Sequence, residues 1–280
     1  MVNDKYLLYW YYNQGGFYLV DECGNYFIED MERLGRGGFG EVFKVNVYNR
    51  TKDHCTSYAR KYFSPSPDND NTHIREIADL RQRFLVEINT QCKLNSLAHD
   101  LIAPIVLFNK QGDMPYFVME LAKDNLRNLI VNMSDSDRRK ATLQILQGVR
   151  LIHQNNYIHR DLKPENILVY EDKKHKISDF GLVKDMDTVR AEVKTKFKPN
   201  AIGSDGYRAP EIRDSGTFSQ QSDIFAVGKI INDIYLVNCP VELRPIISKC
   251  TSHWPEDRYE SIDDLLNALA KLWDGLKESA

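Results

Sequence analysis

The segment that most constrains this chain is the octet from His159 to Asn166, which reads HRDLKPEN. Six of its eight residues carry side chains that ionise or form hydrogen bonds, yet it lies between LQILQGVRLIHQNNYI and ILVY, whose apolar residues favour burial. Buried polar groups are costly unless they are paired or used by the protein. The octet therefore indicates a site where the fold needs charge.

Composition excludes several classes of protein. The chain has 280 residues, enough for one large core or for two lobes, and its 42% hydrophobic and 28% charged residues are typical of a soluble globular protein. A net charge of −3 provides no basic field, so we expect neither nucleic acid nor a membrane as a partner. Five widely spaced cysteines without a CxxC pair argue against disulfides and zinc and favour a cytoplasmic location. The N-terminus resembles neither a signal peptide nor a membrane span.

The pattern of apolar residues changes from strand-like to helix-like along the chain. Three apolar or aromatic runs within residues 1–30 are separated by turn residues, which predicts a meander, and GRGGFGEVFKVNVYN and TSYARKYF indicate further strands. A polar loop over 64–73 precedes a segment that favours one long helix or two. LIAPIVLF and PYFVMELA are again strand-like, and helical spacing dominates from Asn125 onward. The sequence thus predicts an α+β protein.

A glycine-rich turn lies between two of the expected strands, with glycines at Gly35, Gly37 and Gly40. Glycine lets backbone amides approach phosphate oxygens without a Cβ atom in the way. The dinucleotide-binding version of such a turn requires a helix directly afterwards, whereas FKVNVY indicates a strand. The turn alone leaves two interpretations open, a phosphate-binding loop and a tight hairpin.

Two later motifs decide between them. Asp179-Phe180-Gly181 follows thirteen residues after Asn166, and Ala209-Pro210-Glu211 comes later still. Together with the glycine-rich turn and the octet, this order of motifs resembles the eukaryotic-type protein kinase family, from Gly35 to about Arg258. The resemblance implies a two-lobed α+β fold with the ATP cleft between the lobes. We expect a β-rich extension over 1–30, a small N-lobe over 31–122 and a larger helical C-lobe over 123–280.

The resemblance also implies catalytic and metal-binding roles. Asp161 would orient the substrate hydroxyl and accept its proton, and Lys163 would offset charge on the γ-phosphate of ATP. Asn166 and Asp179 would supply oxygen ligands, which suit Mg²⁺. The polar octet would then line the cleft between the lobes.

The nucleotide site implied by the resemblance begins at Lys61, in YARK, which would grip the α- and β-phosphates. Its carboxylate partner is Glu87 or Glu76, and Glu87 leads better into the following strands. Met119 would lie at the back of the adenine pocket, and Asp124 would either reach the ribose or only cap a strand end. The other expected ATP-binding residues are Gly35, Gly37, Gly40, Val42, Ala59, Glu120 and Ala122.

Three further positions have structural roles by resemblance. Asp223 would anchor the backbone of the octet, and Glu211 would pair with Arg258. Gln91 departs from the family, which places an apolar residue there. The chain also has few residues between Asp223 and Arg258, so the helix that many kinases use for docking looks absent.

The predicted activity is the transfer of the γ-phosphate of ATP to serine or threonine hydroxyls of a protein substrate, including autophosphorylation through self-association. The alternatives are a kinase-fold scaffold with weak catalysis and a dual-specificity or tyrosine kinase. A small-molecule kinase is disfavoured by the Ala-Pro-Glu motif. The resemblance also implies a regulatory phosphate in the segment 179–211, because Arg160 precedes Asp161. The candidates are Thr195, ranked first, then Thr188, Ser204 and Tyr207. The alternative is that Asn200, near the usual phosphosite, marks a loop that needs no phosphate.

Overall fold

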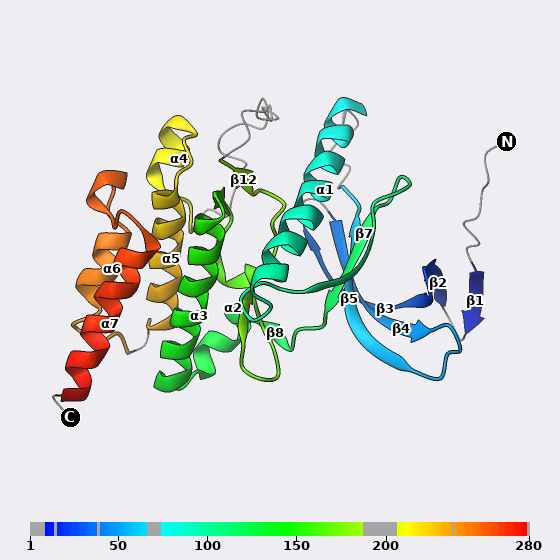
Figure 1. Cartoon of the computed structure of the whole chain (residues 1–280), viewed down its shortest axis with the longest axis horizontal. Coiled ribbons are helices and arrows are strands. Elements are labelled where there is room, and N and C mark those ends of the chain that lie inside the picture. The colour runs from blue at the N-terminus through cyan, green and yellow to red at the C-terminus, as the bar shows by residue number, and fades with distance from the viewer. Residues whose placement is uncertain are drawn as a thin grey trace. The chain divides into compact units, whose positions relative to one another are not determined.

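A computed structural model describes residues 9–13, 16–37, 40–65, 74–186, 206–236 and 238–278. The chain divides into two compact units, one formed by residues 1–88 and 104–121 and the other by residues 89–103 and 122–280. Figure 1 shows the strands of the first unit and the helices of the second. Among the described residues, none of the helices is long and apolar enough to cross a membrane.

The described part of the first unit contains one seven-stranded antiparallel sheet in the order β1-β2-β3-β4-β5-β7-β6. Its strands are β1 (Tyr9–Asn13), β2 (Gly16–Cys23), β3 (Tyr26–Gly37), β4 (Gly40–Asn49), β5 (Cys55–Phe63), β6 (Ile105–Asn109) and β7 (Tyr116–Glu120). The first three strands correspond to the predicted meander. They continue the sheet beyond β4, so the N-terminal extension is part of the same sheet as β5.

The sheet is curled, because β2 also contacts β6 at the other side of the sheet. The curl encloses a small apolar core on the inner face. Buried members of this core are Ile28, Val45, Val47, Tyr62, Tyr116 and Val118. They alternate with residues that point to the opposite face, as the two-residue period of a strand requires. The extension therefore contributes to a core that the remaining strands would leave open.

Helix α1 (Ile74–Leu97) belongs to the first unit as far as Ile88. The ring of Phe84 lies 5.7 Å from that of Phe63 on β5 and 5.6 Å from that of Phe117 on β7. Phe84, Ile88 and Phe117 are at most 1% exposed. Burial of each such side chain stabilises a fold by about 1.5–3 kcal/mol. The segment thus forms one continuous helix, and these contacts fix it against the sheet.

The second unit is mainly helical. Its main helices are α2 (Leu126–Leu129), α3 (Asp135–Gln154), α4 (Pro210–Ser215), α5 (Gln220–Ile234), α6 (Arg244–Cys250) and α7 (Ile262–Glu278). Short strands complete it, namely β8 (Asp124–Asn125), β9 (Tyr157–Ile158), β10 (Ile167–Val169), β11 (His175–Ile177) and β12 (Lys184–Asp185). A β-rich unit and a helical unit confirm the predicted α+β, two-lobed class.

The core of the second unit lies between α3, α5, α6 and α7. Helix α3 begins at Ser134, whose hydroxyl accepts a hydrogen bond from the N–H of Asp137, and it buries Ile145, Val149 and Ile152 along one face. Helices α5 and α6 approach so closely that a Cβ atom at Gly228 would lie 2.5 Å from Cβ of Cys250. Glycine is therefore required there by packing.

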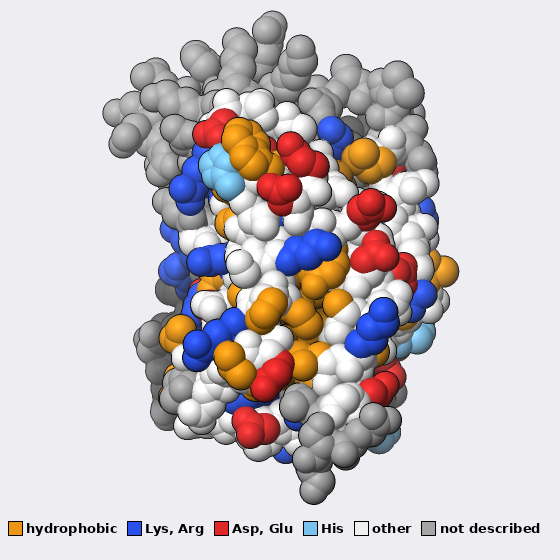
Figure 2. All heavy atoms as spheres, turned by 90° about the vertical axis from the view of Figure 1, so that its left-hand side faces the viewer, with side chains coloured by type: hydrophobic (Ala, Val, Ile, Leu, Met, Phe, Trp, Pro, Cys, Tyr) orange, Lys and Arg blue, Asp and Glu red, His pale blue; other side chains and the backbone are white. Residues whose placement is uncertain are grey.

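The surface around the C-terminal helices carries both signs of charge. Figure 2 shows this face, with acidic and basic side chains interspersed around a central group of hydrophobic side chains. Such a mixture agrees with the net charge of −3. It gives this face no single-sign field for a polyanion.

Candidate active site

The octet follows β9 and ends in a short 3-10 turn at 164–166, and a buried carboxylate holds its backbone. Oδ2 of Asp223 accepts a hydrogen bond from the N–H of His159 at 2.9 Å, and Oδ1 accepts one from the N–H of Arg160 at 3.0 Å. Arg160 has a φ of 72°, in the left-handed region that costs a non-glycine residue about 1–3 kcal/mol. Asp223 offsets this cost through two charge-assisted hydrogen bonds.

Burial and hydrogen bonding act on Asp223 in opposite directions. Burial by itself raises the pKa of this carboxyl, but the hydrogen bond and the charge of His153 and the N–H of His159 together hold the pKa below its ordinary value. Nε2 of His153, on α3, lies 2.9 Å from Oδ2 of Asp223. The carboxylate is therefore ionised at neutral pH and fixed from α3 as well as from the loop.

Asp161 is surrounded by the side chains that the resemblance implied. Its Oδ2 accepts hydrogen bonds from Nζ of Lys163 at 2.9 Å and from Nδ2 of Asn166 at 3.1 Å. Nδ2 of Asn166 also donates to the backbone oxygen of Asp161 at 2.8 Å. The Asp161 side chain is 12% exposed. Three of the predicted residues thus form one hydrogen-bonded group with the Asp161 side chain at its centre.

His159 and Ser178 connect this group to Asp179. Nδ1 of His159 accepts from the N–H of Asp161 at 3.3 Å, and Nε2 lies 3.1 Å from the backbone oxygen of Ser178. The N–H and hydroxyl of Ser178 donate to the backbone oxygen of Asn166 at 2.9 and 3.0 Å. Asp179 follows with a φ of 63°. The backbones of the two expected metal ligands are therefore held together by the fold.

The donor set fits Mg²⁺ with few protein ligands. The amide nitrogen of Asn166 donates its hydrogen bonds to Asp161, so the carboxamide oxygen is the atom that a cation would take. Asp179 would add a carboxylate. The described segments contain no cluster of three or more His, Cys, Asp or Glu side chains that could hold a metal ion by themselves. Mg²⁺ characteristically uses one or two protein oxygens together with phosphate oxygens and water.

In the first unit, Lys61 pairs with Glu87. Nζ of Lys61 lies 2.7 Å from Oε1 of Glu87, and the two side chains are 10% and 0% exposed. Glu76 lies on the same continuous helix eleven residues earlier, about 16 Å away along the axis at 1.5 Å per residue. The choice of Glu87 over Glu76 therefore agrees with the ion pair, and the role of Lys61 toward phosphate stays a prediction.

The glycine-rich turn forms the hairpin between β3 and β4. Gly35 pairs in register with Val42, and Gly37 with Gly40, while residues 38 and 39 lie outside the described part of the chain. A Cβ atom at Gly40 would lie 1.9 Å from the backbone oxygen of Tyr62. Gly40 is thus required by the close approach of β4 to β5.

The first unit holds several of the residues expected around adenine. On β5, buried Ala59 pairs in register with Met119 on β7, and Val42 pairs with Lys61. The N–H of Glu120 donates to the backbone oxygen of Pro104 at 3.2 Å.

In the second unit, Ala122 is partly buried and directly precedes the β8 region. Oδ1 of Asp124 accepts from the N–H of Asn125 at 2.7 Å and from Nδ2 of Asn128 at 2.8 Å. These local hydrogen bonds agree with the capping interpretation of Asp124, and its reach to a ribose stays a prediction.

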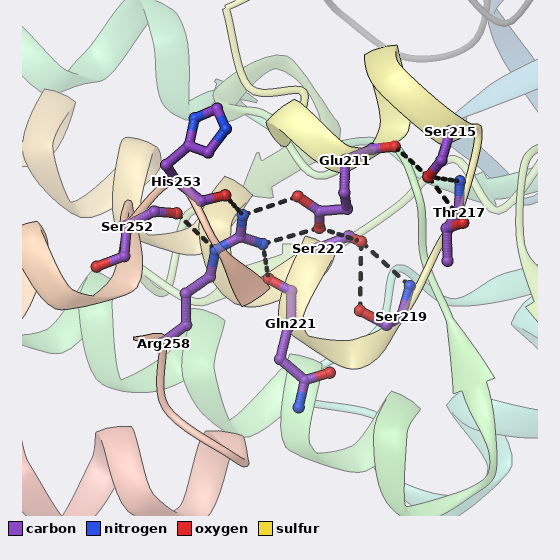
Figure 3. A network of polar contacts seen from close by, with 9 residues as sticks. All are labelled: Glu211, Ser215, Thr217, Ser219, Gln221, Ser222, Ser252, His253 and Arg258. Carbon is purple, nitrogen blue, oxygen red and sulfur yellow. Dashed lines mark hydrogen bonds and ion pairs between the residues drawn. The ribbon is translucent and has the colours of Figure 1, made fainter. Parts of the chain in front are cut away.

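Glu211 and Arg258 form the expected ion pair, shown in Figure 3. Nη2 of Arg258 donates to Oε2 of Glu211 at 2.7 Å, and Nη1 donates to Oε1 at 2.8 Å. Ser222 also donates to Oε1 of Glu211 at 2.9 Å. Burial raises the pKa of Glu211, but the hydrogen bonds from Arg258, from its own backbone N–H and from Ser222, together with the charge of Arg258, lower the pKa overall. The network ties α4 to the start of α5.

The sequence reasoning missed a second polar network beside the octet. Nε of Arg127, on α2, donates to Glu165 at 2.9 Å, and its Nη1 donates to Asp233 at 3.2 Å. The hydroxyl of Tyr207 contacts both Arg127 and Asp233. Glu165 was signalled by its place in the octet, and Tyr207 only as a candidate phosphosite. Their link through Arg127 and Asp233 gave no signal, because these residues are far apart in sequence. Of the expected phosphosites, Thr188, Thr195 and Ser204 lie outside the described residues.

Known protein kinases are similar to most of this chain. The family described as the protein kinase domain matches residues 28–269. The chain belongs to the protein kinase family. It is 32% identical to the human serine/threonine-protein kinase MAK over 214 residues, which are 74% of this chain and 30% of that protein. It is 30% identical to the Arabidopsis thaliana receptor-like kinase TMK4 over 224 residues, 77% of this chain and 22% of that protein.

A third relative is named for tyrosine as well as for serine and threonine. The chain is 28% identical to the Arabidopsis thaliana leucine-rich repeat receptor-like serine/threonine/tyrosine-protein kinase SOBIR1 over 232 residues, 76% of this chain and 34% of that protein. This kinase chain therefore spans about a fifth to two-fifths of the length of the curated relatives it matches. Membership of the family supports a phosphotransferase, with ATP as the substrate that is typical of it.

Proposed function

We propose that this chain is an Mg²⁺-dependent protein kinase that transfers the γ-phosphate of ATP to serine and threonine hydroxyls of proteins, itself included. The observation that carries the proposal is the group of Asp161, Lys163 and Asn166, with hydrogen bonds of 2.9 and 3.1 Å to one carboxylate oxygen. A hydrogen-bonded carboxylate of low exposure, bracketed by a cation and a metal-ligand amide, matches the needs of phosphoryl transfer.

The reaction assigns a task to each of these residues. The substrate hydroxyl oxygen forms the new bond to the γ-phosphorus, the bond from that phosphorus to the β-γ bridging oxygen breaks, and ADP leaves. Asp161 orients the hydroxyl and accepts its proton, and Lys163 offsets charge on the transferred phosphoryl group. Asn166 and Asp179 would hold Mg²⁺, which would supply positive charge to neutralise the phosphates. Lys61, kept in place by Glu87, holds the α- and β-phosphates.

Serine/threonine specificity is supported by Lys163 within the octet and by relatives that are named serine/threonine-protein kinases. The serine/threonine/tyrosine-protein kinase among the relatives makes tyrosine a second acceptor to test. Autophosphorylation between two copies, and the cytoplasmic location expected from the cysteines, belong to the same proposal.

The test is Asp161→Asn, assayed with radiolabelled ATP and a mixed protein substrate. We expect ATP binding close to that of the wild type and turnover lowered by at least about a hundredfold, because general base catalysis typically contributes 10²–10⁴-fold. Phosphoamino acid analysis of the wild-type products should show phosphoserine and phosphothreonine.

The matched control is Asp185→Asn on β12, a partly buried aspartate outside the octet. Its turnover should stay near that of the wild type. Wild-type turnover in Asp161→Asn would refute the mechanism. ATP binding without any transfer by the wild type would instead support a scaffold, and phosphotyrosine among the products would broaden the specificity.

A further inference from the structure

Arg60 is the largest fully buried side chain in the first unit that the mechanism does not use. It lies on β5 between Ala59 and Lys61, and its side chain is 0% exposed. Nη2 and Nε of Arg60 donate to Oδ1 of Asp30 on β3 at 2.5 and 3.1 Å. Nη1 lies 3.6 Å from Oδ2 of Asp21 on β2. A guanidinium removed from water is tolerated because carboxylates from two other strands face it.

Two tyrosines complete the surroundings of Arg60. Its guanidinium carbon lies 4.3 Å from the ring centroid of Tyr62 and 5.1 Å from that of Tyr116, within the range of cation–π contacts. The hydroxyl of Tyr62 donates to Oδ2 of Asp30 at 3.0 Å. The side chain therefore has ionic, hydrogen-bonding and aromatic contacts on the inner face of the curled sheet, and it is held in one position.

The adjacent residue on the strand is Lys61, which points to the opposite face and pairs with Glu87 at 2.7 Å. Successive residues of a strand face opposite sides, and their Cα atoms are about 3.8 Å apart. Adjacent residues of β5 thus place two cations of low exposure on opposite faces of the sheet. Each cation is paired with carboxylates of its own face. Movement of Arg60 toward solvent would require β5 to shift or twist at this point, and Lys61 would move with it.

Both aspartates come from the strands at the extension end of the sheet. Asp21 lies in the extension itself, and Asp30 stands at the start of a register shift between residues 30 and 32 of β3. Asp30 comes two residues after buried Ile28 and before the register shift, so the two-residue period of the strand places both on the inner face. Strands β2 and β3 therefore each direct one aspartate to the same guanidinium.

From this geometry we infer that Arg60, Asp30 and Asp21 position Lys61, and that the N-terminal extension is a working part of the nucleotide site. The inference rests on the proposed function, in which Lys61 holds the phosphates of ATP. Arg60 does not contact ATP in this scheme; it acts through the backbone of β5. A displacement of about 1 Å at a phosphate-holding group can change a rate or affinity by up to about a hundredfold.

The test is a double-mutant cycle on the 280-residue chain. The measured quantity is the dissociation constant for ATP in the presence of Mg²⁺, obtained by displacement of a fluorescent ATP analogue. The variants are Arg60→Met, Lys61→Met and the double variant, measured well below their unfolding temperatures. Arg60→Met should weaken binding about tenfold when Lys61 is present and leave it unchanged within about twofold in Lys61→Met, because residues that act as a unit are not additive. Arg60→Lys, which keeps the charge, should restore part of the affinity.

Val47→Ala controls for stability. Val47 belongs to the same inner core but pairs with Thr56, four residues along β5 from Arg60. It should lower the unfolding temperature and leave the affinity for ATP unchanged. If Arg60→Met does not fold, Asp21→Asn, whose side chain is 20% exposed in the wild type, replaces it in the same cycle with a smaller effect in the same direction.

The outcomes separate the two proposals. If Arg60→Met weakens ATP binding equally in the wild type and in Lys61→Met, or in neither, the positioning role is overturned. Lys61 would still be a phosphate ligand. No effect of Lys61→Met on ATP affinity would refute the proposed task of Lys61 and the inference with it. Weakening that depends on Lys61 would establish the extension as part of the nucleotide site.

Discussion

At the scale of single residues, Glu87 is the carboxylate on which the position of Lys61 most directly depends. It is fully buried and lies 2.7 Å from the ammonium group. Glu87→Gln keeps the size of the side chain and removes its charge, so Lys61 loses its ionic partner in a water-poor site. We expect kcat/KM for ATP to fall by at least about tenfold, measured in steady-state assays.

Glu76→Gln is the matched variant for this prediction, because it changes the other glutamate of the same helix in the same way. Glu76 lies eleven residues before Glu87, so its substitution should leave kcat/KM within about twofold of the wild type. A larger loss in Glu76→Gln than in Glu87→Gln would contradict the assignment of the Lys61 partner.

Residues differ in how far the sequence could predict them. One short motif contains Asp161, Lys163 and Asn166, so the local sequence is enough to predict that they lie together. Arg60 could not be placed in the same way, because in TSYARKYF it looks like a polar residue on the solvent face of a strand. Its burial depends on Asp21 of β2 and Asp30 of β3, which are 39 and 30 residues away in the sequence. Long-range strand order decides its environment, and no local pattern encodes that order.

At the scale of elements, β11 carries a buried histidine that should make stability depend on pH. Burial, with a smaller effect of the Lys140 charge, lowers the pKa of His175 from 6.5 to about 4. Between these values the unfolded chain binds a proton that the folded chain excludes, so the free energy of unfolding rises with pH. At about pH 5 the fold should be about 2 kcal/mol less stable than at about pH 7.5 from this group alone. Urea denaturation at both pH values measures the difference.

His175→Gln isolates this contribution. In the wild type, Nδ1 of His175 lies 2.9 Å from Oε1 of Gln144 on α3, and a glutamine amide can donate to the same oxygen. The variant should lose the pH dependence between about 4.5 and 6.5. Glu211 and Asp223, whose pKa values are lowered, lose their contributions only as the pH falls below their ordinary values, 4.5 and 3.8. An unchanged slope in His175→Gln would show that other groups carry it.

Long elements with local start signals were the predictable ones. The capping box of Ser261 and Asp264 before α7 is present, with the N–H of Ser261 donating to Asp264 at 3.1 Å and the N–H of Asp264 donating to Ser261 at 3.2 Å. The two-residue strands β8, β9 and β12 gave no signal. They exist because the turns around the octet bring distant backbone segments together, which depends on tertiary contacts.

At the scale of the whole molecule, two features depart from what the resemblance to the family implies, the N-terminal extension and the connection between α5 and α6. The extension adds β1 and β2 to the sheet, as the turn residues suggested. The sequence suggested one boundary between the lobes, near residue 122. In the structure, residues 89–103 also group with the second unit. Gln91 lies in that segment, fully buried, and donates to the backbone oxygen of Ala103 at 2.8 Å. Pairing of this kind depends on the loop at 98–104, which the sequence does not specify.

The second difference lies between α5 and α6, where many kinases have a docking helix. Helix α5 ends at Ile234 and α6 begins at Arg244, and the described residues between them form no helix. Val241, in this connection, is 64% exposed. Fewer residues are thus available there to form a remote surface that recognises a folded substrate.

Substrate recognition should therefore rest on the residues around Asp161. A peptide that the kinase phosphorylates well should have a kcat/KM within about threefold of that of the intact protein containing it, because binding surface farther from Asp161 contributes little. Steady-state assays of the peptide, of the intact protein and of the intact protein with its acceptor hydroxyl removed measure this. The intact protein without its acceptor hydroxyl should inhibit phosphorylation of the peptide only at concentrations at or above the KM of the peptide. A preference of about a hundredfold for the intact protein would reveal a docking surface elsewhere on the chain.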